Sequence, residues 1–301
     1  SPLWYYEGMT VRYPKTTQQF LKQFATKEQC LRYLAGIRWK GSFRCPVCAH
    51  TSAWFTHKEY FRCASCRSDI SVLHGTIFAQ SHIPIPIWFL TIWYVVSQKQ
   101  GMNALGLSRV LGIRQKTGWE LLRKIRSAMV RPNRNRLSGL VEVDEILIGG
   151  KRHIFEGRSP QGKTLVLVAA EDKNGRVGRI RMRIIPNATA PSLRAAMTAM
   201  IEPGSTIRTD GWTSYQCVQW GYRHRPVQQR SLKPGEDPTP LIHLISSLLK
   251  RWLLGTHQGG IQTTHLQKYL DEFVFRFNRR TSRSRGKLFY RVIQNILHVS
   301  D

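Results

Sequence analysis

The sequence predicts a multidomain α+β protein, and three features of its 301 residues lead to this prediction. Two C-x2-C pairs lie in an aromatic-rich region near the N-terminus, apolar residues at helical spacing follow, and strand-like segments occupy the second half. We therefore expect an N-terminal helical segment over residues 1–38, a zinc ribbon over 39–82, a helix-turn-helix domain over 83–131, a linker over 132–139 and an α/β domain over 140–301.

The composition is strongly basic, since 46 Lys and Arg residues against 18 Asp and Glu residues give a formal net charge of +28. A chain with this charge repels itself, so we expect a polyanionic partner, of which nucleic acid is the best candidate. The alternative is a ribosomal or membrane-surface protein, although 9 Trp and 12 Phe indicate packed cores. The most apolar stretch, residues 83–96, is shorter than the ~20 residues of a membrane span and is expected to be a buried helix.

The N-terminal residues from Ser1 to Tyr13 contain no long apolar run, so we expect no signal peptide and a cytoplasmic protein. Because Ser1 is not a natural translation start, we also expect residues to precede it. In a reducing compartment, paired cysteines favour metal binding over disulfides. Of the six cysteines, Cys30 and Cys217 are expected to lie in packed cores.

The other four cysteines predict a zinc site. Cys45 and Cys48 form one C-x2-C pair, Cys63 and Cys66 form another, and 14 residues separate the pairs. Two such turns can hold four thiolates around one Zn²⁺, and with every ligand supplied by the protein the ion is structural. A redox pair is the alternative reading. The aromatic residues between the pairs favour a short antiparallel hairpin.

Three helices are expected over residues 86–98, 103–111 and 115–129, with Gly112 in the turn between the last two. This arrangement is typical of a helix-turn-helix, in which the start of the last helix enters the DNA major groove. A small helical bundle with a solvated charged face fits the same pattern, but the zinc ribbon and the net charge favour DNA binding. The side chains expected at DNA are Arg114, Gln115, Lys116, Thr117, Lys124, Arg126, Arg131, Arg134 and Arg136.

The second half has the strand order of a ribonuclease H-like α/β domain. Three strands are followed by a helix and a further strand, expected over residues 140–148, 164–170, 179–185, 190–201 and 205–212 respectively. In that fold the first and fourth strands are neighbours, so Asp144 and Asp210 are expected side by side although 66 residues separate them.

Two adjacent carboxylates suit a site for two Mg²⁺ or Mn²⁺ ions that act on a phosphodiester. Surface acids at strand ends are the alternative. A third ligand is expected on a helix over residues 240–254, which contains no carboxylate, so His243 is the candidate. Asp271 and Glu272 on the next helix are the fallback ligands, and Lys250 is a candidate phosphate-binding residue.

With these motifs the chain resembles bacterial insertion-sequence transposases of the zinc-ribbon kind, which are ISXO-like and related to Merlin elements. Besides the two cysteine pairs, the resemblance is carried by V-D-E-I-L-I-G-G-K at 143–151, T-D-G-W at 209–212, L-K-R-W-L-L-G-T-H at 249–257 and Y-L-D-E-F-V-F-R-F-N-R-R at 269–280. The family's two catalytic aspartates fall on Asp144 and Asp210. Its third position, where members carry Glu, Asn or His, falls on His243.

The resemblance implies a DDE-type transposase that binds terminal inverted repeats, cleaves the element ends and joins the freed 3′-OH to target DNA. It also implies double-stranded DNA as partner, at least a homodimer on DNA, and a nucleoid-associated protein. A basic run near the C-terminus is expected to contact phosphates: Arg276, Arg279, Arg280, Arg283, Arg285 and Lys287. The alternatives are a domesticated DNA-binding regulator without catalysis, a ribonuclease H-like nuclease acting on RNA or DNA junctions, and a zinc-ribbon transcription factor.

Overall fold

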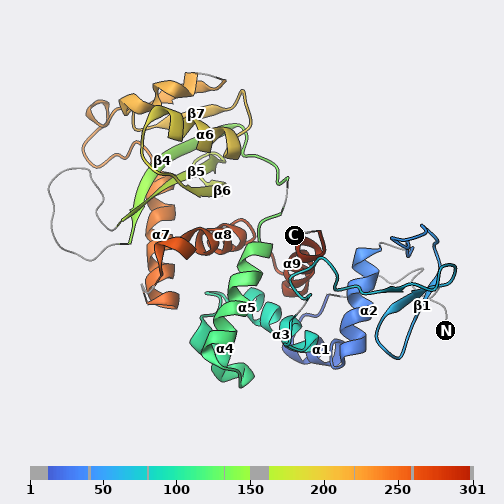
Figure 1. Ribbon diagram of the computed structural model, residues 1–301. Helices are drawn as coiled ribbons and strands as arrows, with labels where there is room; N and C mark the ends of the chain where they lie inside the picture. Colours follow the sequence, from blue (N-terminus) through green and yellow to red (C-terminus); the bar gives the residue numbers. More distant parts are fainter. Residues whose placement is uncertain are drawn as a thin grey trace. The chain divides into compact units, whose positions relative to one another are not determined.

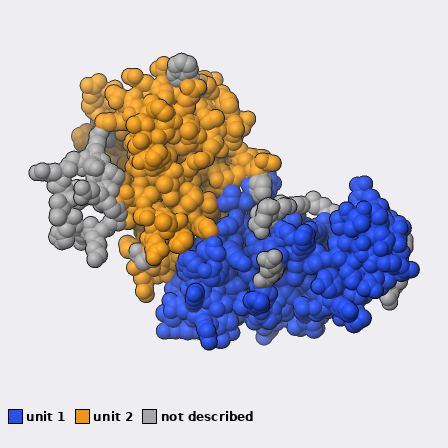
Figure 2. All heavy atoms as spheres, viewed as in Figure 1, with its two compact units in different colours: residues 1–132, 282–301 blue, residues 133–281 orange. Residues whose placement is uncertain are grey.

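A computed structural model of the chain describes residues 13–39, 42–79, 81–131, 133–149, 163–219, 221–258 and 261–298 (Figure 1). The chain divides into two compact units (Figure 2). Unit 1 consists of residues 1–132 and 282–301, and unit 2 consists of residues 133–281. The last two residues of the expected G-G-K sequence, Gly150 and Lys151, lie outside the described residues.

Unit 1 contains the helices α1 (Thr17–Gln23), α2 (Lys27–Arg38), α3 (Ile85–Ser97), α4 (Ala104–Leu111), α5 (Gln115–Ala128) and α9 (Arg285–His298). Its core includes a set of aromatic side chains from helices far apart in sequence. The ring of Phe289 on α9 lies 5.1 Å from Phe20 on α1 and 5.3 Å from Phe89 on α3. All three side chains are buried, so α9 is part of the core of this unit.

This position of α9 differs from our expectation that residues 140–301 form one domain, because residues 282–301 pack with the N-terminal unit. Close packing is visible at Gly286, where an added Cβ would lie 2.6 Å from the backbone oxygen of Pro14. The N-terminal helical segment also differs in detail. It forms two helices, because the Thr26 side chain caps α2 by accepting the Gln29 N–H in a capping box.

The expected aromatic hairpin is present. Strands β1 (Ala53–Phe55) and β2 (Phe61–Cys63) pair antiparallel, and β3 (Asp69–Ile70) adds a third strand beside β2. Helices α3, α4 and α5 match the three helices expected from the sequence. Gly112 ends α4 with φ of 64°, a left-handed conformation that glycine adopts without strain. On α4, Leu107 is buried, whereas Leu105 and Val110 are exposed.

Unit 2 is built on a five-stranded sheet with the order β6-β5-β4-β7-β8. The strands are β4 (Leu140–Ile148), β5 (Thr164–Asp172), β6 (Val177–Ile184), β7 (Thr206–Thr209) and β8 (Arg223–Pro226). The first three form an antiparallel meander, whereas β7 pairs parallel to β4 and β8 parallel to β7. The expected neighbourhood of the first and fourth strands is therefore confirmed.

Helices cover both faces of this sheet, as the alternation in β4 requires. Val141 and Val143 pack on one face with α6 (Ala190–Met200) and the 3-10 helix η2 (Thr213–Gln219). Ile146 and Ile148 pack on the opposite face with α7 (Pro240–His257) and α8 (Leu266–Phe277). Glu142 and Asp144 have the same parity as Ile146, so they point toward the face that α7 covers.

The edge of the sheet at β6 is covered by side chains of α8 and of the residues directly after this helix. The Asn278 side chain accepts a hydrogen bond from the Ile180 N–H (2.7 Å) and donates one to the Ile180 carbonyl (3.1 Å). Gln267 accepts from the Ile184 N–H at 3.0 Å, and Arg280 donates to the Gly178 carbonyl at 3.3 Å. These contacts protect the edge strand from pairing with another chain.

Across the residues that the structure describes, no helix combines the length and the apolar character needed to span a membrane. The apolar stretch around residue 90 is α3, whose Trp88 and Trp93 side chains are buried as expected.

Candidate functional site

The four paired cysteines converge at one point in unit 1. Their sulfur atoms all lie within 4.8 Å of one another, and the Cys45–Cys66 and Cys48–Cys63 sulfur distances are 3.6 and 3.5 Å. Tetrahedral thiolates with Zn–S bonds of ~2.3 Å have sulfur atoms roughly 3.8 Å apart, so these donors fit one structural zinc.

The turns after the two cysteine pairs are alike, which explains why the spacing repeats. Ala49 and Arg67, each directly after the second cysteine of its pair, have φ of 61°. Their backbone N–H groups donate to the carbonyls of Cys45 and Cys63 at 2.9 and 3.2 Å. Each turn therefore folds back on its first cysteine.

In unit 2 the parallel pairing of β4 and β7 brings the two predicted aspartates to the same level. Leu140 pairs with Thr206 and Glu142 with Arg208, a constant offset of 66 residues that also relates Asp144 to Asp210. Asp210 directly follows the end of β7. Its carboxylate accepts a hydrogen bond from the Trp212 N–H at 3.0 Å, and Gly211 between them has φ of 81°.

His243 lies on the first turns of α7 and faces the same aspartate. Its Nε2 atom is 4.0 Å from Oδ2 of Asp144, and its Nδ1 atom forms a hydrogen bond with the Asp237 carboxylate. Thr239, the N-cap residue of α7, donates its hydroxyl to the same Asp144 oxygen at 2.8 Å. Asp144 and His243 are thus neighbours although 99 residues separate them in sequence.

The Asp237–His243 contact was not anticipated from the sequence. A carboxylate on Nδ1 of a histidine keeps the proton on that nitrogen and leaves the Nε2 lone pair free for a metal ion. Here the free nitrogen is the one that faces Asp144. The only sequence signal was an acidic residue in the D-P-T-P segment just before a helix, which is too common to single out.

Asp144 is in an environment that disfavours its charge. Burial raises the pKa of its carboxyl group to about 6, and the nearby Glu145 and Asp210 carboxylates add to this effect, against the hydrogen bond from Thr239. No Lys or Arg forms an ion pair with Asp144 or Asp210 within the described ranges. The donor set of two carboxylates and an imidazole therefore suits a divalent cation, which would compensate the negative charge.

These three side chains do not converge as closely as the cysteines. Among the described residues, the cysteine cluster is the only group of three or more ligand residues whose donor atoms all lie within 4.8 Å. The fallback ligands are engaged elsewhere. Glu272 is fully buried and pairs with Arg276 at 2.9 Å, and Asp271 accepts a hydrogen bond from Gln267 at 3.2 Å.

Two further acidic residues of β4, whose roles were not predicted from the sequence, connect the site to the surrounding elements. Glu142 is fully buried and accepts a hydrogen bond from the Leu241 N–H at the start of α7. Glu145 points to the opposite face of the sheet, where the Tyr215 hydroxyl of η2 donates to it at 2.5 Å.

The side chains expected at DNA are in varied environments. Arg114, Gln115 and Lys116 are exposed at the start of α5, and Thr117 is half-buried. Lys250 and Arg136 are exposed, whereas Lys124 and Arg134 are half-buried. Arg126 is only 2% exposed, so it does not belong to the exposed basic surface that we expected.

The C-terminal basic run is split between the two units, because Arg283, Arg285 and Lys287 belong to unit 1. In unit 2 its arginines contact protein groups. The guanidinium of Arg279 lies 4.1 Å from the centre of the Phe275 ring, and Arg280 donates to backbone carbonyls along β6.

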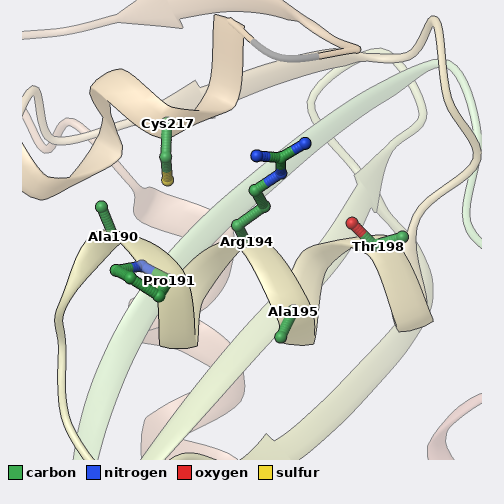
Figure 3. Close-up of a pocket in the computed structure, with 6 residues that line it drawn as sticks. All are labelled: Ala190, Pro191, Arg194, Ala195, Thr198 and Cys217. Carbon is green, nitrogen blue, oxygen red and sulfur yellow. The ribbon is translucent and has the colours of Figure 1, made fainter.

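A pocket of roughly 690 Å³ opens on α6, away from these carboxylates. It is lined by Ala190, Pro191, Arg194, Ala195 and Thr198 of α6 and by Cys217 of η2 (Figure 3). These residues belong to the face of the sheet opposite α7, and they include no carboxylate. Cys217 is half-buried at the margin of the core, and not inside it as we expected, and burial raises the pKa of its thiol.

Comparison with known proteins gives the class of the chain. A model of a transposase zinc-ribbon domain matches residues 25–69, which contain the cysteine cluster. A model of the ISXO2-like transposase domain matches residues 136–278, which contain Asp144, Asp210 and His243. The chain therefore has the two domains of a zinc-ribbon transposase.

Both matched segments belong to transposase families, as the motifs of the sequence suggested. A similar curated protein is an uncharacterized protein in transposable element ISH50 of Halobacterium salinarum. It is 24% identical over 295 residues, which cover 89% of this chain and 95% of the relative. This relative is archaeal, so the similarity extends beyond the bacterial elements that we had expected.

Proposed function

We propose that this transposase cuts and joins DNA by metal-dependent phosphodiester chemistry at Asp144, Asp210 and His243. The observation that supports this most is the meeting of these residues from three separate elements. The constant register of β4 and β7 relates the aspartates, and His243 Nε2 is 4.0 Å from the Asp144 carboxylate. Unit 2, with its antiparallel meander followed by parallel strands, is then a ribonuclease H-like domain.

The proposed reaction has two steps on the same site. Water first attacks the phosphodiester at the element end, which breaks the P–O3′ bond and frees a 3′-OH. That 3′-oxygen then attacks a target phosphodiester, so one P–O bond forms as another breaks and no ATP is needed. Divalent Mg²⁺ or Mn²⁺ ions, two in our proposal, would activate the attacking oxygen and stabilise the leaving oxygen.

The residues of the chain have distinct parts in this proposal. Asp144, Asp210 and His243 would hold the ions, and Asp237 would keep the His243 Nε2 lone pair available. Lys250, exposed on α7 two turns beyond His243, is suited to bind a phosphate of the DNA strand. Glu145 and Tyr215 would hold the segment after Asp210 in place from the other face of the sheet.

We further propose that unit 1 reads the terminal inverted repeats. Helices α4 and α5 with Gly112 between them would form a helix-turn-helix, and the exposed start of α5 would enter the major groove. Its Arg114, Gln115 and Lys116 side chains are exposed, as that role requires. Because two element ends must be joined together, the active form would be at least a homodimer on DNA.

The test is cleavage and joining of a labelled duplex that carries the terminal inverted repeat, in Mg²⁺ and in Mn²⁺. We expect activity in wild type and its loss in Asp144→Ala, Asp210→Ala and His243→Ala, with duplex binding retained. A wild type that binds the duplex but never cuts it would instead favour a DNA-binding regulator. If His243→Ala is the only variant that stays active, His243 is excluded as the third ligand, and the proposal keeps Asp144 and Asp210 as metal ligands.

A further inference from the structure

An ion pair with a buried carboxylate links the three elements that carry the proposed metal ligands. Glu142 on β4 and Arg208 on β7 are register partners, and the Arg208 Nη1 atom lies 3.3 Å from the Glu142 Oε1 atom. The second oxygen of Glu142 accepts the Leu241 N–H, in the first turn of α7, at 2.9 Å. We call these three groups, the two side chains and the Leu241 N–H, the tether.

Every proposed ligand lies two residues after a member of the tether. In a strand, residues i and i+2 point to the same face, so the Glu142 and Asp144 carboxylates both point toward α7. The contacts agree, because Glu142 bonds to Leu241 and Asp144 bonds to Thr239, both at the start of that helix. The pairs are Glu142 with Asp144, Arg208 with Asp210, and Leu241 with His243.

A contribution to the stability of the fold is a weak explanation for the presence of this ion pair. The Glu142 side chain is 1% exposed, and burial raises the pKa of its carboxyl group. Among the described side chains, Glu142 Oε1 and Arg208 Nε are buried atoms without a hydrogen-bond partner. Burying two charges costs as much as their attraction returns unless every hydrogen bond is made, so an apolar pair would serve the fold at least as well.

We propose that Glu142 and Arg208 are positioning residues that set the spacing of Asp144, Asp210 and His243 by tying β4, β7 and the start of α7 together. This inference rests on the proposed function. The pair touches neither DNA nor metal in this scheme; it acts through the residues that do. The same sheet provides a matched control, the buried Glu171, which pairs with Arg179 at 2.5 Å and has no part in the site.

The test compares full-length Glu142→Gln, Arg208→Gln and Glu171→Gln with wild type and Asp144→Asn. Free Mn²⁺ is counted by electron paramagnetic resonance during titration with MnCl₂, which measures binding without any reaction. Glutamine keeps an acceptor for the Leu241 N–H but removes the charge. We expect the Mn²⁺ Kd to rise roughly 10- to 100-fold in Glu142→Gln and Arg208→Gln, because loss of a group that orients a metal ligand weakens metal binding by this much. The Kd of Glu171→Gln should stay unchanged.

Thermal unfolding of the same variants separates positioning from general loss of stability, since Glu142→Gln and Glu171→Gln both remove the charge of a buried carboxylate that pairs with an arginine. If Glu142→Gln does not fold, Arg208→Gln decides the question, because that side chain is 23% exposed and its loss is easier to accommodate. Folded variants that bind Mn²⁺ as wild type does would overturn the tether alone. A wild type without Asp144-dependent Mn²⁺ binding would overturn the proposed function and the tether with it.

Discussion

The burial of Asp144 predicts that removing its charge stabilises the protein when no divalent cation is bound beside it. Its carboxyl group has a pKa of about 6 against an ordinary value of 3.8, mainly because it is buried and secondly because Glu145 and Asp210 are near. The side chain is 15% exposed, so solvent screens this effect little. A difference of roughly two pH units corresponds to about 3 kcal/mol of folding free energy, an upper estimate.

The penalty appears in a defined pH range. Below about pH 4 the folded and unfolded chains both hold the Asp144 proton, and the carboxyl group costs nothing. Between pH 4 and pH 6 the unfolded chain ionises while the folded chain keeps the proton, so wild type loses stability as pH rises. Above pH 6 both states are ionised and the full penalty remains. Asp144→Asn avoids it, and its amide oxygen can still accept from Thr239.

The assay is thermal unfolding of wild type and Asp144→Asn from pH 4.5 to 8, with zinc retained and no added Mg²⁺ or Mn²⁺. At pH 7.5 we expect the variant to melt up to about 6–12 °C higher, at roughly 2–4 °C per kcal/mol for a unit of this size. The difference shrinks toward pH 4.5. Added Mn²⁺ should raise the melting temperature of wild type only. Glu202→Gln, which removes an exposed carboxylate, is the control. Equal melting temperatures at every pH would refute the reasoning.

Four other substitutions test separate parts of the molecule. His243→Glu replaces an imidazole, which suits Mn²⁺ better than Mg²⁺, so the ratio of Mn²⁺- to Mg²⁺-supported cleavage should fall; an unchanged ratio would argue against metal contact. Cys48→Ala should abolish zinc binding and duplex affinity but leave Mn²⁺ binding by unit 2 intact, as metal analysis and titration would show. Lys116→Ala should weaken duplex binding and lower the salt dependence by about one counterion, whereas the exposed Lys173→Ala should change neither. Asn278→Ala leaves the Ile180 backbone groups at the β6 edge without their side-chain partner, so we expect a loss of about 1–3 kcal/mol in urea denaturation, and no loss would mean that water replaces it.

Local patterns predicted the elements well because their signals extend over only a few residues. The strand expected over residues 140–148 is β4 with the same bounds, and the helix expected from residue 240 begins at Pro240. The cysteine spacing likewise predicted a cluster that the folded chain forms. Boundaries were less accurate where a cap intervenes, as at Thr26, which divides the N-terminal helical stretch into α1 and α2.

Contacts between distant segments were harder to anticipate. Arg126 looked like part of a basic surface, yet it is buried, because the exposure of a side chain on a helix depends on what packs against it. Residues 282–301 follow unit 2 in the chain but supply α9 to the core of unit 1. Arg280 was expected to contact DNA phosphates, and the structure shows it bonded to the β6 edge, as is the neighbouring Asn278.

For this protein the sequence alone determined the spacing of the four clustered cysteines and singled out Asp144 and Asp210 as candidate ligands, because each lies in a short local motif. Tertiary structure alone decided which groups meet around Asp144. The register of β4 against β7 relates it to Asp210, and the start of α7 brings Thr239 and His243 beside it. Such meetings depend on how strands pair and helices dock across about 100 residues, and no short stretch of sequence encodes that geometry.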